Sequence, residues 1–463
     1  MAVAANGEKR ASDLSTFRRW FVLILVSAGS STIYGPAYLK NAFYDSQRAA
    51  LDLTNTQVGA LLSAYAITAM ICYLPSGLVA DRMRMRTLSA TGFLLTAGLT
   101  FWYATLPSFN TLLLIFVAMG VSTILLWWGV RYKLVRLIAD ESEYSRNIGI
   151  SYGFYGAAGL LVGLVGSAIL ARLGSDSPEA FRAFLLLYAF LILTLGVLSI
   201  VMIPKFEGEI VESRSVKQVF VDAVGSLSNP VVLLTAATMF FVYFFYTGVN
   251  YATTYLAYLG ADANLNNITS VVRTYGVTLL AGPIFGALAF KAKRPSRVIW
   301  IGSLVAALGL AVLALVPTPA PVALPATTTL VLTVALIGVG LGFISNGVFG
   351  IVSGQLTEGK VPLSVFGAAT GVVSVVGFMP DTFSSTWFGS IIDGAAAAGD
   401  EGTAYPVIFW ILAGAAVVAV ACAQLLAAYV RRNRQKLEDD YAAAEAAAAA
   451  ALQDRPVGMA AAS

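Results

Sequence analysis

The sequence predicts an all-α membrane protein with twelve transmembrane helices, and three observations lead to this fold class. Apolar residues make up 58% of the 463 residues and charged residues only 12%, whereas a soluble domain has roughly 45–50% and about 25%. Twelve apolar runs are long enough to cross a bilayer, which takes about 20 residues each. The basic residues are concentrated in every second connection between these runs. The runs lie near residues 19–43, 56–79, 87–106, 110–136, 147–172, 180–203, 230–259, 265–290, 297–317, 327–354, 364–392 and 404–430.

The distribution of lysine and arginine predicts the orientation of the chain. Twelve spans place both termini on the same side of the membrane. If that side is the cytoplasm, the inner segments contain 24 of the 29 Lys and Arg residues, in agreement with the positive-inside rule. The five exceptions, on or toward the outer side, are Lys40, Arg48, Arg172, Arg182 and Arg273. We therefore expect a multi-pass protein of the cytoplasmic membrane with both termini in the cytoplasm.

Polar segments divide the chain into two groups of six spans. The longest polar connection, residues 204–229, is charged and predicts a cytoplasmic linker. The expected organisation is a cytoplasmic N-terminus at 1–18, a six-helix bundle at 19–203, the linker at 204–229, a second six-helix bundle at 230–430 and a cytoplasmic tail at 431–463. The tail begins with RRNRQKLEDD and becomes alanine-rich, which favours a solvated helix followed by a partly disordered end.

The two halves resemble each other when the sequence is shifted by 218 residues. The coinciding glycines are Gly120 and Gly338, Gly129 and Gly347, Gly149 and Gly367, Gly153 and Gly371, and Gly159 and Gly377. Chance alignment is the alternative, because glycine is common in membrane helices. A true repeat is parallel, with a pseudo-two-fold axis along the membrane normal, and lets one half rock against the other around a midplane site. Spans 5 and 11 share the spacing GxxxGxxxxxG and would slide at the interface, since small residues permit close approach.

Several kinds of chemistry are excluded by the composition. The chain contains no histidine, and its two cysteines, Cys72 and Cys422, lie inside apolar runs. Histidine ligands, a disulfide framework and a cysteine metal site are therefore not expected. Neither a nucleophile–base pair nor a phosphate-binding loop emerges. We expect no enzyme activity, no cofactor, no metal and no nucleic-acid partner, and nothing resembles a cleavable signal peptide.

The connection between spans 2 and 3 carries a motif. It reads GLVADRMRMR and resembles the G-x-x-x-D-R-x-G-R-R/K signature of the major facilitator superfamily, whose fold has two bundles of six helices. The match holds at Gly77, Asp81, Arg82 and Arg86. The resemblance implies that these residues control gating, with Asp81 near the cytoplasmic start of span 11, where it steadies the outward-open state. A carboxylate near a helix N-terminus is favoured electrostatically; the simpler alternative is a topology anchor.

The motif also departs from the family pattern. Arg84 and Met85 stand where the family prefers Gly and Arg, and the second-half copy, residues 286–294, has Phe290 in place of the aspartate. These departures put the detailed gating contacts in doubt. Trp127-Trp128 with a basic cluster in span 4, and Pro380-Asp381 with Gly389 and Asp393 in span 11, resemble a poorly characterised prokaryotic branch related to organic-anion transporters.

Two charged residues lie deep within predicted spans. Arg273 is about eight residues into span 8, or roughly 12 Å deep at 1.5 Å per residue. An arginine facing lipid at that depth is expensive, so we expect Arg273 to face the central cavity and bind substrate. Asp381 is similarly deep and is the candidate for coupling. It either pairs with Arg273 in the empty protein or takes up a proton, since desolvation and a nearby cation shift a carboxyl pKa in opposite directions.

A basic cluster ends span 4. Arg131 follows Trp128 by three residues, so the two are expected on one helical face, while Lys133 lies roughly 200° from Arg131. The functional interpretation is an anion-attracting cluster of Arg131, Lys133 and Arg136 at the inner mouth of the pathway, with Arg131 deepest and with Arg131 and Trp128 as substrate contacts. The alternative is snorkelling to lipid headgroups combined with positive-inside anchoring.

Tyrosines and amides supply further candidates for substrate contact. Tyr34 and Tyr38 in span 1 correspond to Tyr251 and Tyr255 in span 7, and in the superfamily these spans line the cavity. Phenolic hydroxyls bind oxygen-rich solutes; the alternative is an interfacial aromatic belt, which suits Tyr38 and Tyr255 better than the deeper Tyr34 and Tyr251. The secondary candidates are Asn250, Asn346, Tyr65 and Tyr275.

Together these features predict a secondary active transporter that moves a small polar, anionic organic solute by alternating access. Basic residues that reach into the membrane outnumber deep carboxylates, which favours a negative solute. The expected partners are this solute, a coupling proton and the lipid bilayer, and the expected oligomeric state is a monomer. Efflux of amphipathic drug-like compounds and a non-transporting membrane receptor on the same fold are the alternatives.

Overall fold

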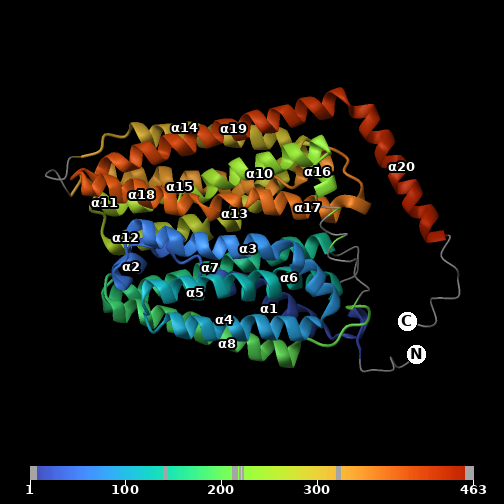
Figure 1. Ribbon diagram of the computed structural model, residues 1–463, viewed down its shortest axis with the longest axis horizontal. Helices are drawn as coiled ribbons and strands as arrows, with labels where there is room; N and C mark the ends of the chain where they lie inside the picture. Colours follow the sequence, from blue (N-terminus) through green and yellow to red (C-terminus); the bar gives the residue numbers. More distant parts are fainter. Residues whose placement is uncertain are drawn as a thin grey trace.

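The computed structural model describes residues 8–138, 144–210, 217, 221, 224–319 and 325–453. These residues form a long helical bundle with both ends of the chain at one end of the molecule (Figure 1). We call this end the terminal end and the opposite one the far end. Parts of the predicted linker 204–229, residues 1–7 and residues 454–463 lie outside the described residues.

The first half contains η1 (Ala11–Asp13), α1 (Thr16–Tyr34), α2 (Lys40–Leu51), α3 (Asn55–Arg82), α4 (Met85–Tyr103), α5 (Phe109–Gly120), the π-helix η2 (Val121–Trp128), α6 (Gly129–Leu137), α7 (Tyr144–Leu173) and α8 (Pro178–Met202). The second half contains α10 (Pro230–Gly248), α11 (Tyr251–Tyr258), α12 (Ala263–Val271), the π-helix η4 (Val272–Gly276), α13 (Thr278–Ala292), α14 (Pro295–Leu315), α15 (Thr328–Ile351), α16 (Gly354–Glu358), α17 (Leu363–Gly377), the 3₁₀ helix η6 (Met379–Thr382), α18 (Ser384–Ala397), η7 (Glu401–Thr403) and α19 (Ala404–Arg432). The tail forms α20 (Arg434–Gln453).

Local sequence sets many of the helix starts. Thr54 and Gln57 form a reciprocal capping box at the start of α3, and the hydroxyls of Ser177 and Thr327 cap α8 and α15. Such caps satisfy backbone N–H groups that have no partner inside the helix. The helices α8, α10 and α14 each begin with proline, which lacks the N–H that the first turn leaves unpaired.

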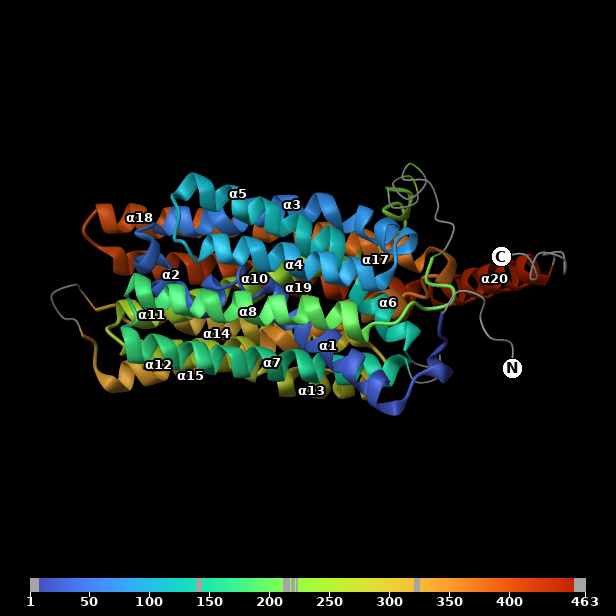
Figure 2. The same cartoon turned by 90° about the horizontal axis from the view of Figure 1, so that it is seen from below.

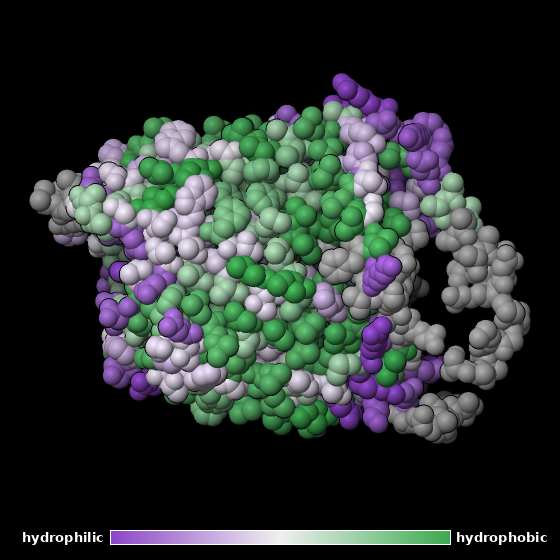
Figure 3. Space-filling view, viewed as in Figure 1, coloured by the Kyte–Doolittle hydropathy of each residue, from purple (hydrophilic) through white to green (hydrophobic). Residues whose placement is uncertain are grey.

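The helices are suited to a bilayer. Within the described residues, ten helical segments are long and apolar enough to cross a membrane. α1 and α4, with 19 residues each, are the remaining two of the twelve spans. α1 packs on α7, and α4 packs on α8. Figure 3 shows hydrophobic side chains over the middle of the bundle and hydrophilic ones at both ends.

Each half has its own apolar core. One cluster of buried side chains draws on α1 to α8 and includes Trp127 and Phe184. The other draws on α10 to α19 and includes Phe245 and Phe409. The two halves lie side by side along the bundle (Figures 1 and 2).

The glycines of the sequence repeat occupy similar packing positions. A Cβ on Gly129 would lie 2.8 Å from the Ala80 Cβ of α3, and a Cβ on Gly347 would lie 2.2 Å from the Phe285 ring of α13. In each half, therefore, the fourth span needs glycine where it crosses the second.

Five of the spans expected as single regular helices are interrupted in the described chain. Span 1 breaks at residues 35–39, span 4 at η2, span 7 at 249–250, span 8 at η4 and span 11 at η6. Pro36 and Pro380 account for two of the breaks, because proline lacks an N–H and clashes with the preceding turn. These interruptions correct the expectation of continuous spans.

Candidate functional site

Four of these interruptions, in spans 1, 7, 8 and 11, meet between the two halves. Hydrogen bonds join Tyr38 in the break of span 1 to Asp381 in that of span 11. Arg273 in η4 bonds to Asn41, just after the break of span 1, and to Asn250 in the break of span 7. Irregular backbone at membrane depth is tolerated where protein or a cavity surrounds it, and transporters use broken helices to form their binding sites. We call this region the central polar cluster, comprising Tyr38, Lys40, Asn41, Tyr243, Asn250, Tyr251, Arg273, Thr274 and Asp381.

Asp381 is held by phenols. Its side chain is 2% exposed, and its Oδ2 accepts hydrogen bonds from the hydroxyls of Tyr38, at 3.2 Å, and Tyr243, at 2.7 Å. Its Oδ1 has no hydrogen-bond partner among the residues that the structure describes. Tyr38 belongs to the first half and Tyr243 to the second, so the carboxyl group lies at the boundary between the two halves, which we call the seam. Of the two interpretations of Tyr38, substrate contact and an outer aromatic belt, this position between the halves favours the first.

Arg273 bridges the halves through neutral acceptors. The residue is 3% exposed, and its Nη1 donates to Asn250 Oδ1 while its Nη2 donates to the Asn41 carbonyl at 2.5 Å and to Thr274 Oγ1 at 3.1 Å. Its Nε has no acceptor within the described chain. The predicted pair with Asp381 does not form here, because each group has other partners.

Lys40 was missed by the sequence analysis, which placed it at the outer end of span 1. The structure puts it at the start of α2 and only 5% exposed. Its Nζ lies 5.4 Å from the centroid of the Tyr251 ring, and it interacts electrostatically with both Asp381 and Arg273. The Gly35-Pro36 pair is the signal that pointed to a break before it.

The remaining predicted contacts hold positions around the central polar cluster. The hydroxyl of Tyr251 donates to the Ser385 carbonyl at 3.2 Å. Tyr65 is hydrogen-bonded to Thr123 at 2.8 Å and packs its ring 5.3 Å from that of Tyr38. These tyrosines thus support the cluster from both halves.

Three further candidates have contacts within or between the halves. Asn346 Oδ1 accepts from Thr278 at 3.0 Å within the second half. The ring of Tyr275 packs against Gly159 of α7 in the first half, where a Cβ would lie 2.3 Å from it. Tyr34 is partly buried and packs on the core of the first half. Tyr255, for which an aromatic belt was the alternative interpretation, is buried against Tyr405.

An aromatic wall extends from the central polar cluster toward the terminal end. Phe378 lies 4.8 Å from Tyr243, 5.5 Å from Tyr73 and 6.3 Å from Trp128. Tyr73 and Trp128 belong to the first half. Rings from both halves therefore meet beside Asp381.

Arg131 contacts aromatic rings of α7. Its guanidinium lies 4.6 Å from the Tyr152 ring centroid and 5.3 Å from that of Tyr155, both on α7. Trp128 packs on Tyr73 of α3. The expected common face of Arg131 and Trp128 stays a prediction.

The far end is closed by α3 and α18. The Asp393 carboxylate accepts from the backbone N–H groups of Asn55 and Thr56 at 3.0 and 2.8 Å, from Asn55 Nδ2 at 2.8 Å and from Thr56 Oγ1 at 2.6 Å. It thus caps the first turn of a helix from the other half. A Cβ on Gly389 would lie 2.3 Å from the Asn55 carbonyl oxygen, and one on Gly59 would lie 2.2 Å from that of Ser385. We call these contacts the far-end latch.

A second contact joins α2 to α12 at the same end. Asn266 Nδ2 donates to Asp45 Oδ2 at 3.1 Å. Asp45 lies beyond the predicted first span, and burial raises its pKa to about 7, while Arg48 and Asn266 act in the opposite direction.

The predicted gating residues lie at the terminal end. Lys133 Nζ donates to Asp81 at 2.9 Å and to the Ala80 carbonyl at 2.8 Å, both within the first half. Arg86 Nε donates to the Ile203 carbonyl at 2.6 Å. Gly77 has open space where a Cβ would be, and Arg82 is exposed. Lys133 is thus the partner of Asp81 among the described residues, and the place of Asp81 near the start of span 11 stays a prediction.

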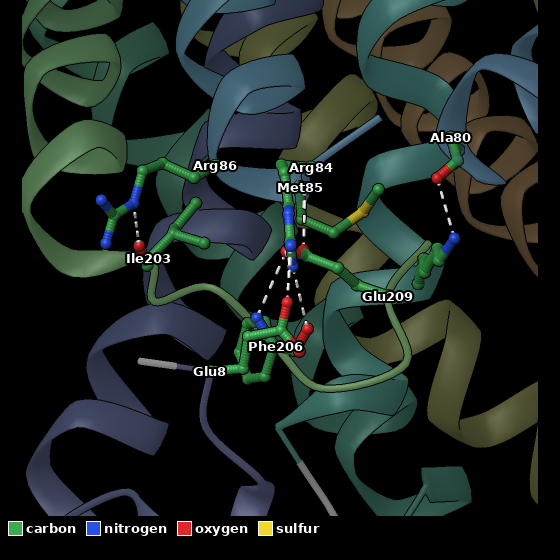
Figure 4. A network of polar contacts seen from close by, with 9 residues as sticks. Glu8, Ala80, Arg84, Met85, Arg86, Ile203, Phe206 and Glu209 are labelled. Atoms are coloured by element: carbon green, nitrogen blue, oxygen red, sulfur yellow. Dashed lines mark hydrogen bonds and ion pairs between the residues drawn. The ribbon is translucent and has the colours of Figure 1, made fainter. Parts of the chain in front are cut away.

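Arg84, where the motif departs from the family pattern, occupies the centre of this region (Figure 4). It donates to Glu8 at 2.5 Å and to the fully buried Glu209 at 2.9 Å. Glu209 also accepts from the backbone N–H groups of Met85 and Phe206, at 3.0 and 3.3 Å. This terminal latch ties the N-terminal segment and the start of the linker to the α3–α4 loop.

In the described part of the chain, no group of three or more Cys, Asp or Glu side chains is placed to hold a metal ion. The central polar cluster contains a cationic arginine and lysine, a carboxyl group and phenols. Groups of these kinds donate and accept hydrogen bonds, and a carboxyl group can exchange a proton.

The chain is similar to known membrane proteins over most of its length. Residues 20–381 match the family described as the Major Facilitator Superfamily. Inner membrane protein YqcE of Escherichia coli K12 is 26% identical over 379 residues, covering 80% of this chain and 86% of the relative. Inner membrane protein YihN of the same organism is 24% identical over 386 residues, covering 82% and 89%.

Solved transporter structures share the fold. The nucleoside transporter NupG, as a D323A mutant, superposes with a TM-score of 0.68 at 17% identity, covering 88% of this chain and 99% of its own. A bacterial homologue of the human lysosomal transporter Spinster gives 0.65 at 14% identity, covering 92% and 99%. These matches confirm the predicted all-α fold, and with the apolar helices they make the chain a multi-pass membrane protein.

Proposed function

The chain belongs to the Major Facilitator Superfamily, and we propose that it is a secondary active transporter of a small polar, anionic organic solute. Transporters occur among its structural neighbours. The observation that carries the anionic assignment is the buried guanidinium of Arg273 at the seam, bonded only to neutral acceptors among the described residues. A buried cation without a counter-ion is costly, and an anionic solute supplies the missing charge.

Alternating access follows from the arrangement of the seam. The hydrogen bonds between the halves cluster in the far half of the bundle, at Asp45, Asn55, Thr56 and Asp381. With both termini in the cytoplasm, the far end is the outer end, and this conformation is closed to the outside. Breaking the far-end latch while closing the terminal end exposes the same cluster to the opposite side.

Proton coupling is assigned to Asp381. Its Oδ2 is held by Tyr38 and Tyr243 from opposite halves, so rocking of the halves changes how many donors stabilise the carboxylate. Hydrogen bonds to the charged form oppose protonation, and their loss favours it. The carboxyl group therefore binds and releases its proton in step with opening and closing.

Uptake into vesicles that contain the purified protein tests the proposal. Sugar acids, dicarboxylates, sugar phosphates and sulfonates are supplied with and without a pH gradient. We expect at least one acid to accumulate under the gradient, Arg273→Ala to reduce its uptake by about 10- to 100-fold, and Asp381→Asn to abolish the gradient dependence. Normal uptake by Arg273→Ala contradicts the anionic site, and unchanged gradient dependence in Asp381→Asn contradicts the coupling role.

The aromatic wall favours a second candidate, efflux of amphipathic compounds. Rings of Tyr73, Trp128, Tyr243 and Phe378 lie within 4.8–6.3 Å of one another along the seam, and such faces also attract cations. The lipophilic cation tetraphenylphosphonium separates the two: extrusion of this cation, without uptake of any acid, supports efflux over anion transport.

A further inference from the structure

Lys40 is a buried cation without a counter-ion. It is 5% exposed, and among the residues that the structure describes its ammonium forms neither a hydrogen bond nor an ion pair within 4.0 Å. Its close contact is the face of the Tyr251 ring, with Nζ 5.4 Å from the ring centroid. Attraction to a ring face offsets only a small part of the cost of burying an ammonium.

The neighbouring charges do not neutralise it. Asp381 interacts with Lys40 through space, but it lies beyond ion-pair distance and gives Oδ2 to Tyr38 and Tyr243. Arg273 adds a second positive charge close enough to repel Lys40. Lys40 therefore has a carboxyl group on which it acts only through space and a second cation nearby.

The unpaired polar atoms of Arg273 and Asp381 indicate which kind of chemical group binds beside Lys40. Arg273 Nε and Asp381 Oδ1 are both buried without hydrogen-bond partners in the described chain. Lys40 offers three donors and Arg273 Nε a fourth, while a protonated Asp381 offers one more at Oδ1. An acidic group with several oxygens satisfies such donors, and charge-assisted bonds of this kind are the strong ones.

We propose that Lys40 is the residue that docks the acidic group of the transported solute, with Arg273 Nε as its second donor. This assignment rests on the proposed anion transport and names its substrate class. The solute is a small organic acid, a carboxylate, phosphate monoester or sulfonate, bound through its acidic group against the edge of Tyr251. The negative charge of the acid neutralises the Lys40 ammonium. The acid therefore binds more tightly than the corresponding uncharged compound.

The test measures binding by the purified full-length protein. The probes are gluconate, succinate, glucose 6-phosphate and methanesulfonate, paired with the neutral parents sorbitol, succinamide, glucose and dimethyl sulfone. A ligand that binds the folded state raises its Tm. We expect one acid to stabilise the wild type more than its parent, and Lys40→Met to weaken binding of that acid by about 10- to 100-fold.

A structural role for Lys40 gives a different result. Methionine has similar length without charge, so the ligand-free Lys40→Met protein keeps or gains thermal stability if the ammonium is an uncompensated charge. A lower Tm of the ligand-free variant contradicts the proposal, since the lysine then supports the fold. Lys40→Cys in a Cys72→Ala, Cys422→Ala background provides rescue: aminoethyl methanethiosulfonate restores an ammonium and the affinity, and methyl methanethiosulfonate does not.

The outcomes separate this proposal from the one before it. If an acid binds the wild type and Lys40→Met equally well, the docking role of Lys40 is wrong while anion transport stands. If the wild type binds no acid more tightly than its neutral parent, the proposed anionic substrate fails and the role of Lys40 fails with it.

Discussion

At the scale of single residues, two deep charges in the sequence, Arg273 and Asp381, were recognisable because charge is rare inside apolar runs. The hydrogen-bond partners of these two residues could not be recognised from the sequence. Depth along a span says that Arg273 avoids lipid, but the carbonyl of Asn41 is its acceptor only because span 1 breaks. Lys40 stayed hidden for the same reason, since an unbroken span places it at the membrane surface.

Asp45 predicts a pH dependence of far-end closure. Burial against Asn266 of the other half raises its pKa to about 7, with Arg48 opposing the shift and Asp176 and Glu401 adding to it. Opening exposes the carboxyl group and returns its pKa to about 4. The closed far end binds the proton more tightly, so closure is strongest at low pH and loses this contribution as the pH rises to about 7.

Spin labels at Ser108 and Ala398, exposed positions on opposite halves at the far end, measure this effect. We expect the long-distance population to be larger at pH 8 than at pH 5, and Asp45→Asn to remove most of the difference. An equal pH dependence in Asp45→Asn shows that another group controls closure.

At the scale of elements, the sequence predicted where spans lie but not where they break. Proline marks the breaks at Pro36 and Pro380, and both were readable. The break at 249–250 and the π-helix η4 carry no proline. They depend on packing between helices, which a single sequence does not contain.

The far-end latch predicts that one added methyl group at Gly389 destabilises the closed far end. Gly389→Ala places a Cβ 2.3 Å from the Asn55 carbonyl oxygen, and because backbone does not yield cheaply, the cost is about 1–3 kcal/mol against the closed state. Gly394→Ala on the same helix is the matched control, since a Cβ there meets open space. The same spin-label pair reports opening in Gly389→Ala only; equal opening, or none, in both variants contradicts the latch.

The terminal latch predicts a difference between two neighbouring glutamates. Glu209 is buried and accepts from Arg84 and two backbone N–H groups, whereas Glu207 pairs with the exposed Arg10, which holds the Glu207 pKa below its usual value. Exposed pairs contribute little. We expect Glu209→Gln to lower the Tm by about 2–6 °C and Glu207→Gln to leave the Tm unchanged. A similar shift in both variants contradicts the claim that the terminal latch stabilises the fold through Glu209.

At the scale of the whole molecule, the composition and the repeat predicted most of the architecture. Apolar content indicated a membrane bundle, and the coinciding glycines indicated two similar halves; Gly129 and Gly347 indeed pack alike. The contacts across the seam could not be predicted from the sequence. The contacts of Asp393 with Asn55 and Thr56, for example, join residues more than 330 positions apart.

The terminal end also gives the motif of the α3–α4 loop a physical role in this chain. Arg84 replaces the usual glycine and carries the contacts to Glu8 and Glu209. The α3–α4 loop, the N-terminal segment and the start of the linker are therefore held together within the first half.

A density map of the protein with its bound acid most directly tests the central claim. The account predicts the acidic group within hydrogen-bonding distance of Arg273 Nε and Lys40 Nζ, at the seam where the four helix breaks meet. Density for the solute elsewhere, beside Arg131 or only against the aromatic wall, with Arg273 and Lys40 still unpaired, would contradict it.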